Sequence, residues 1–116
     1  MKRRRSGKII NIVDTAAFRP WTNYLPYCAA KGGLATLTWG LARALAPNVQ
    51  VNGIAPGPVL FPRGISRRER QAALDKTLLK REGSPEDIAR AALFLLEGSD
   101  FVTGIILPVD GGRMLC

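Results

Sequence analysis

The apolar positions of this chain fall into short runs that are separated by helical patterns. Ile9 to Val13 is a run rich in β-branched residues, and similar runs extend from Val49 to Ala55 and from Val102 to Val109. Short apolar runs without polar alternation are typical of strands that are buried on both faces, as in a parallel sheet. We therefore predict three strands in these segments.

A leucine stripe follows the first run. Its members recur at three- and four-residue spacing and mark one apolar face of a helix; they are Leu34, Leu37, Leu41 and Leu45. Pro26 suits the first turn of this helix, where a missing N–H is harmless, and Pro47 ends it. We predict a helix over about residues 26–46.

Two serines mark the starts of further helices between the second and third runs. Ser66, with Glu69 three residues later, is the signature of a capping box, and we expect its helix to reach about Lys80. Ser84 precedes Pro85 and two acidic residues. That order supplies an N-cap, a first-turn proline and negative charge near the positive end of a helix.

Strands that alternate with helices predict an α/β fold with parallel strands and right-handed crossovers. The length of 116 residues suits one domain. In a doubly wound sheet, ligands bind beyond the carboxyl ends of the strands. Here those ends are Asp14, Pro56–Gly57 and Asp110–Gly112. The candidate chemistry therefore converges on one edge of the sheet.

The net charge of +8 bears on the choice of partners. Basic residues cluster at Lys2–Arg5, Arg63–Arg70 and Lys76–Arg81. Nucleic-acid binding is kept as an outside alternative, because no helix-turn-helix, zinc-finger or RNA-binding signature accompanies the charge. The favoured interpretation is a solvated basic surface together with a pocket for a phosphorylated cofactor.

The cysteines and the hydropathy pattern bear on location. Two thiols, Cys28 and Cys116, suggest no disulfide framework and suit a reducing cytoplasm, where we expect the protein. No apolar run approaches the ~20 residues of a membrane span, so no membrane association is expected. The chain has no histidine, and no metal site is expected.

Tyr27 and Lys31 are four residues apart, so they share a helix face. An ammonium near a phenol favours the phenolate, which predicts that Lys31 lowers the pKa of Tyr27 from its ordinary ~10. Such a phenol is a usable proton donor or acceptor. Asp14 can reach the same space. Two plainer interpretations stay open: a surface pair on a helix, and an aspartate that caps a turn.

Five ordered segments are together highly specific. They are Gly7–Ile12, Tyr27–Leu34, Val51–Gly57, Gly83–Ala89 and Val102–Gly112. In this order they resemble the C-terminal half of the short-chain dehydrogenase/reductase family, over about residues 7–115. The resemblance implies the C-terminal half of a doubly wound, Rossmann-type parallel sheet. About three adjacent strands with flanking helices are expected.

The resemblance also implies roles for individual residues. Tyr27 is the expected catalytic acid/base, and Lys31 is expected to tune it and to hold the nicotinamide ribose. Pro56, Gly57 and Val59 correspond to the segment that lies along the nicotinamide. We therefore expect these five residues to bind the cofactor.

Asp14 stands where the family usually has serine, and this departure resembles bacterial pteridine reductase-like members. A carboxyl group can bind the amino-pyrimidine edge of a pterin, or pass a proton to a ring nitrogen together with Tyr27. We expect Asp14, Pro58, Leu60 and Trp21 to contact the substrate.

The implied function is that of an NAD(P)H-dependent oxidoreductase that reduces a pterin or another small carbonyl or imine. NADP(H) is the expected cofactor and NAD(H) the alternative. The family's glycine-rich turn is absent from residues 1–116, which we therefore expect to form a single partial domain without the N-terminal dinucleotide-phosphate-binding half.

The expected partners are a small-molecule substrate and either further copies in a homo-oligomer or a complementing N-terminal half. The first predicted strand would be exposed where the missing strands pair, and it carries no charge or proline to protect that edge. The alternative to an enzyme is a truncated, catalytically inactive fragment that serves at most as an oligomerisation or interaction module.

Overall fold

A computed structural model describes residues 6–116, and its centre is a three-stranded parallel sheet. The strands are β1 (Gly7–Ile12), β2 (Val49–Pro56) and β3 (Ile106–Val109), in the spatial order β1-β2-β3. The predictions of parallel strands and of three adjacent neighbours are confirmed. The basic cluster Lys2–Arg5 lies outside the described residues.

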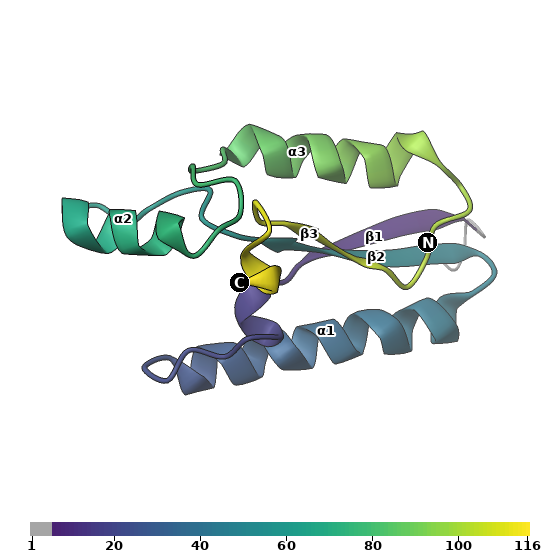
Figure 1. The fold of residues 1–116 in the computed structure, drawn as a ribbon. Helices are drawn as coiled ribbons and strands as arrows, with labels where there is room; N and C mark the ends of the chain where they lie inside the picture. Colours follow the sequence, from purple (N-terminus) through teal and green to yellow (C-terminus); the bar gives the residue numbers. More distant parts are fainter. Residues whose placement is uncertain (1–5) are drawn as a thin grey trace.

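Helices cover both faces of the sheet (Figure 1). Helix α1 (Leu25–Leu45) lies along one face and α3 (Pro85–Leu93) along the other, while α2 (Arg67–Asp75) extends beyond the carboxyl ends of the strands. Three short turns complete the chain: η1 (Thr15–Ala17), η2 (Phe94–Gly98) and η3 (Arg113–Leu115). Within residues 6–116, no helix has both the length and the apolar character needed to cross a bilayer.

The core is centred on β2. Val51 and Ile54 are fully buried, and Val51 packs with Val49 of the same strand and Ala42 of α1. Each apolar side chain buried in this way contributes about 1.5–3 kcal/mol to folding. Because β2 has a strand on each side and a helix on each face, it fixes where the three strand ends lie.

The predicted capping box at Ser66 and the predicted N-cap at Ser84 are confirmed, and Ser84 proves to belong to a capping box as well. The Glu69 N–H donates to Ser66 Oγ at 3.1 Å, and the Ser66 N–H donates to the Glu69 carboxylate at 2.9 Å. Ser84 and Asp87 form the same reciprocal pair at the start of α3. These local pairs fix where α2 and α3 begin.

The end of α2 differs from the prediction. The helix stops at Asp75, whereas the sequence predicted a helix to about Lys80. Thr77 is completely buried, and its hydroxyl accepts the Lys80 N–H at 3.0 Å. The Leu78 N–H donates to the Gly111 carbonyl at 2.9 Å. The segment therefore leaves the helix to bond the turn that follows β3.

The start of β3 also differs. The strand begins at Ile106, whereas the sequence predicted a strand from Val102. Here side chains replace part of the backbone ladder: the Val51 N–H donates to Thr103 Oγ1 at 3.0 Å, and Asn52 Nδ2 donates to the Val102 carbonyl at 2.9 Å. The segment thus follows β2 without forming a regular strand.

Two glycines of the fold have opposite tolerance for a side chain. A Cβ on Gly57 would lie 2.6 Å from Asp110 Cα, whereas a Cβ on Gly33 in α1 would meet nothing within 4 Å. We expect Gly57→Ala to lower the free energy of unfolding by roughly 1–3 kcal/mol, through overpacking against backbone. Gly33→Ala should raise it by about 0.5–1 kcal/mol, because glycine is unfavourable inside helices. Urea unfolding measures both, and equal effects would contradict the close Gly57–Asp110 approach.

The outer side of β1 faces no other strand within residues 6–116. An unpaired strand edge is a template for pairing with another chain. We expect concentration-dependent association in light scattering after size exclusion. Ile12→Lys should weaken it, because Ile12 is exposed on this strand and edge charges oppose pairing. The control is Leu115→Lys, an exposed leucine at the other end of the chain. A chain that stays monomeric at every concentration would contradict the expectation.

Candidate active site

A cleft of about 990 Å³ opens at the carboxyl ends of the strands. Its walls come from the η1 turn, the loop after β2, α2 and the segment after β3. Most of the predicted site residues line it: Asp14, Trp21, Pro56, Gly57, Pro58 and Leu60. The structure therefore brings together residues that are far apart in the sequence.

Asp14 uses its two carboxylate oxygens differently. Oδ1 accepts the Ala16 N–H at 2.8 Å and the Thr15 hydroxyl at 3.3 Å, which caps the η1 turn. Oδ2 accepts the hydroxyl of Tyr27 at 2.5 Å. The turn-capping role and the contact with the tyrosine thus hold at the same time, and the cap orients the oxygen that receives the phenol.

The ionisation of Tyr27 follows from its surroundings. Burial, together with the hydrogen bond to Asp14 and the negative charge of Asp14, raises the pKa of Tyr27 from 10.0 to about 12. Lys31 Nζ lies 5.9 Å from the centre of the Tyr27 ring and donates to the Ile12 carbonyl at 2.9 Å. The prediction that Lys31 lowers this pKa is therefore wrong for this structure, because burial and Asp14 outweigh the more distant ammonium. Tyr27 is protonated throughout the neutral range.

An aromatic wall stands beside the phenol. The Trp21 ring lies nearly parallel to that of Tyr27, with centroids 5.9 Å apart and an interplanar angle of 17°. Tyr24 meets Trp21 edge-on at 6.0 Å. Because Trp21 also lines the cleft, it presents a flat apolar surface next to the phenolic hydroxyl.

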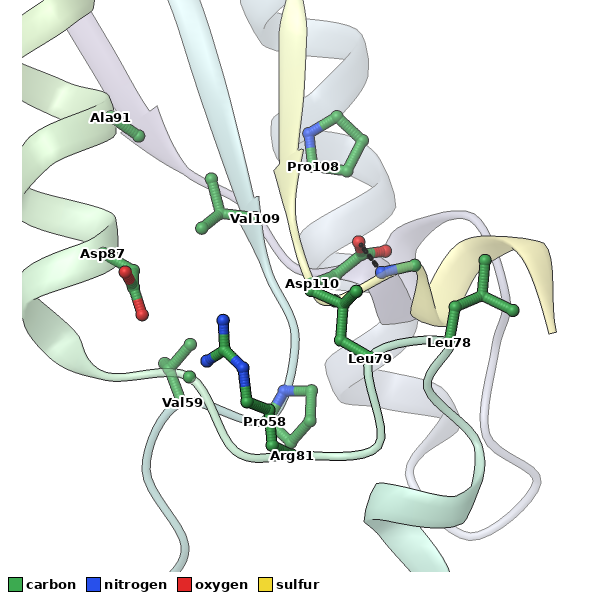
Figure 2. Close-up of a pocket in the computed structure, with 13 residues that line it drawn as sticks. Pro58, Val59, Leu78, Leu79, Arg81, Asp87, Ala91, Pro108, Val109 and Asp110 are labelled. Atoms are coloured by element: carbon green, nitrogen blue, oxygen red, sulfur yellow. Dashed lines mark hydrogen bonds between the residues drawn. The ribbon is translucent and has the colours of Figure 1, made fainter.

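Three predicted residues are absent from the lining of this cleft, and these are Tyr27, Val59 and Lys31. Tyr27 reaches the cleft through its hydrogen bond to Asp14. Val59 lines a second cavity of about 490 Å³, and Pro58 borders both spaces. Figure 2 shows Val59 and Arg81 in this second cavity, between α3 and the end of β3. Lys31 lines neither space and lies one helical turn beyond Tyr27. Val59 and Asp14 thus line different spaces, with Pro58 between them.

Three cationic residues that were not predicted as site residues line the cleft, and these are Arg19, Lys76 and Arg113. In the sequence, Lys76 stands out only as part of the basic cluster Lys76–Arg81. Arg19 donates to the Met114 carbonyl at 3.3 Å and so connects the loop after η1 to the C-terminal segment. No short motif contains these residues. The available signal is the position of Arg113, directly after the Asp110–Gly112 strand end. In the part of the chain that the structure describes, no group of three or more metal-ligating side chains occurs.

The sequence matches known proteins over nearly its whole length. Residues 1–113 match the family described as enoyl-(acyl carrier protein) reductase. Dihydromonapterin reductase of Klebsiella pneumoniae is 40% identical over 110 residues, which are 95% of this chain and 45% of the relative. The dihydromonapterin reductase of Escherichia coli O6:K15:H31 matches with the same identity and coverage.

The fold matches a solved structure as well. A crystal structure from Agrobacterium tumefaciens, described as a candidate 2-deoxy-D-gluconate 3-dehydrogenase with bound NADP, superposes with a TM-score of 0.92 at 37% identity. The match covers 99% of this chain and 49% of that one. The chain thus spans about half the length of the relatives that it matches. Its ordered motifs, its parallel sheet and these matches show that the chain belongs to the short-chain dehydrogenase/reductase family.

Proposed function

We propose that this chain supplies the acid/base and substrate-facing part of an NADP(H)-dependent reductase. The proposed substrate is a pterin or another small carbonyl or imine. The observation that carries the proposal is the 2.5 Å hydrogen bond from the Tyr27 hydroxyl to Asp14, at a cleft large enough for a small molecule. The dihydromonapterin reductases that match most of the chain support the choice of substrate class.

Tyr27 is the proposed proton donor. Like an ordinary phenol, Tyr27 is protonated at neutral pH, and its hydrogen bond to Asp14 keeps the hydroxyl next to the cleft. A substrate oxygen or ring nitrogen takes this proton as it gains a hydride at the neighbouring carbon. A phenolate next to a carboxylate is unfavourable. After Tyr27 donates its proton, we therefore expect the Tyr27–Asp14 pair to take up one proton from solvent.

The donors on one face of α1 fit the nicotinamide ribose. The Lys31 ammonium and the Tyr27 hydroxyl lie on neighbouring turns; the Tyr27 side chain is exposed and Lys31 is half-buried. Pro56, Gly57 and Val59 are proposed to lie along the nicotinamide. A bound reduced nicotinamide would supply the hydride. NADP(H) is preferred over NAD(H), in line with the NADP bound in the Agrobacterium relative.

The substrate side of the cleft suits a flat heterocycle. The Asp14 carboxylate can accept hydrogen bonds from an amino-pyrimidine edge, and Trp21 can stack on a planar ring. Pro58 and Leu60 add apolar surface to the same cleft. This set of groups is the basis for proposing a pterin in particular.

Association with another polypeptide is a second proposal. Leu37 and Trp39 on α1, together with Leu93 and Phe94 near the end of α3, are about half exposed. We propose that apolar surface at these positions takes part in contacts with another polypeptide. Together with the open edge of β1, it favours a second copy or a complementing N-terminal half as the partner. For a chain without catalytic activity, an interaction module is the alternative proposed role.

Titration of the purified chain with NADPH, followed by a dihydropterin turnover assay, tests the proposed function. We expect binding, and we expect Tyr27→Phe to lower the turnover rate by about 10²–10⁴-fold through loss of the proton donor. Tyr24→Phe is the matched control, since Tyr24 packs against Trp21 without a side-chain hydrogen bond at the helix start. Absence of both binding and turnover, or full activity of Tyr27→Phe, would refute the proposal.

A further inference from the structure

We infer that Cys28 is a positioning residue that fixes the Trp21 wall of the cleft against Tyr27. The catalytic meaning of this inference rests on the proposed function, whereas its structural content does not. The inference starts from a buried thiol that the proposed chemistry leaves unused. Cys28 is 5% exposed, and it directly follows Tyr27 in α1.

The thiol bonds the backbone of Trp21 at two points. Cys28 Sγ accepts the Trp21 N–H at 3.3 Å, and the Cys28 S–H donates to the Trp21 carbonyl at 3.9 Å. A thiol is a weak partner in both directions, but here it serves one N–H and one carbonyl of the same residue. These two contacts tie the loop before α1 to the helix that carries Tyr27.

Other contacts of the loop do not replace this link. Tyr24, the residue at the start of α1, makes no capping hydrogen bond with its side chain. The Tyr24 N–H donates to the Trp21 carbonyl at 3.4 Å, which is a bond within the loop itself. The position of Trp21 relative to the helix therefore depends on Cys28, on this long bond from Tyr24 and on ring stacking.

The link has a consequence at the proposed reaction centre. Trp21 lines the cleft and stacks nearly parallel on Tyr27, so a shift of its backbone would move both the substrate wall and the cover of the phenol. Cys28 itself is absent from the lining of the cleft. It acts through Trp21, and the reaction would require no thiol chemistry.

Trp21 fluorescence in a Trp39→Phe background tests the inference without cofactor or substrate, because the chain has two tryptophans. We expect Cys28→Ala to increase acrylamide quenching of Trp21, to shift its emission to the red and to reduce the near-ultraviolet circular dichroism of the stacked pair. Cys28→Ser should retain the parent signals, since a hydroxyl can also donate and accept. Cys28→Val, which keeps apolar volume but makes neither bond, should behave like Cys28→Ala and replaces it if the alanine variant does not fold.

Two controls separate positioning from general destabilisation. Ala35→Gly weakens α1 at another buried site, and Cys116→Ala removes the exposed thiol; neither should change the Trp21 signals. Unchanged Trp21 signals in Cys28→Ala and Cys28→Val would overturn the inference, as would equal changes in Ala35→Gly. A chain that fails to bind NADPH leaves these signals readable, so failure of the proposed function and failure of this inference are distinguishable.

Discussion

Pairing of β2 with a parallel strand on each side is the constraint on which the rest of this structure depends. It aligns the carboxyl ends of all three strands, so that Asp14, Gly57 and Asp110 meet at one edge of the sheet. Gly57 can approach Asp110 so closely only because it has no side chain. Strand pairing therefore fixes the turn at Gly57, which borders the cleft, and the positions of the candidate site residues at the strand ends.

Features that depend on neighbouring residues could be predicted from the sequence. The capping box of Ser66 and Glu69 is one example, and the apolar run that forms β2 is another. Features that depend on distant partners could not. The early end of α2 requires Gly111, and the late start of β3 requires the side chain of Asn52. Neither partner is adjacent in the sequence to the element that it shortens.

In the candidate site, too, the residues could be predicted from the sequence, whereas their mutual arrangement could not. Residue types and family motifs were sufficient to select Asp14, Tyr27 and Lys31, and the structure brings the first two into contact. The direction of the shift in the pKa of Tyr27 was predicted wrongly, because a four-residue spacing specifies neither the burial of the phenol nor whether the ammonium or the carboxylate lies nearer. Here the carboxylate accepts the phenolic hydroxyl, while the ammonium turns to a backbone carbonyl of β1. The Tyr27 phenol is accordingly held in its protonated form.

Carbon-13 NMR of the labelled phenolic carbon of Tyr27, recorded in a Tyr24→Phe background, tests this central claim most directly. The titration is followed over the pH range in which circular dichroism shows a folded chain. The account predicts that Tyr27 remains mostly protonated at pH values above its ordinary pKa of 10.0, in line with a pKa of about 12, and that Asp14→Asn lowers the midpoint. A midpoint at or below 10.0 in the parent chain, unchanged by Asp14→Asn, would contradict it.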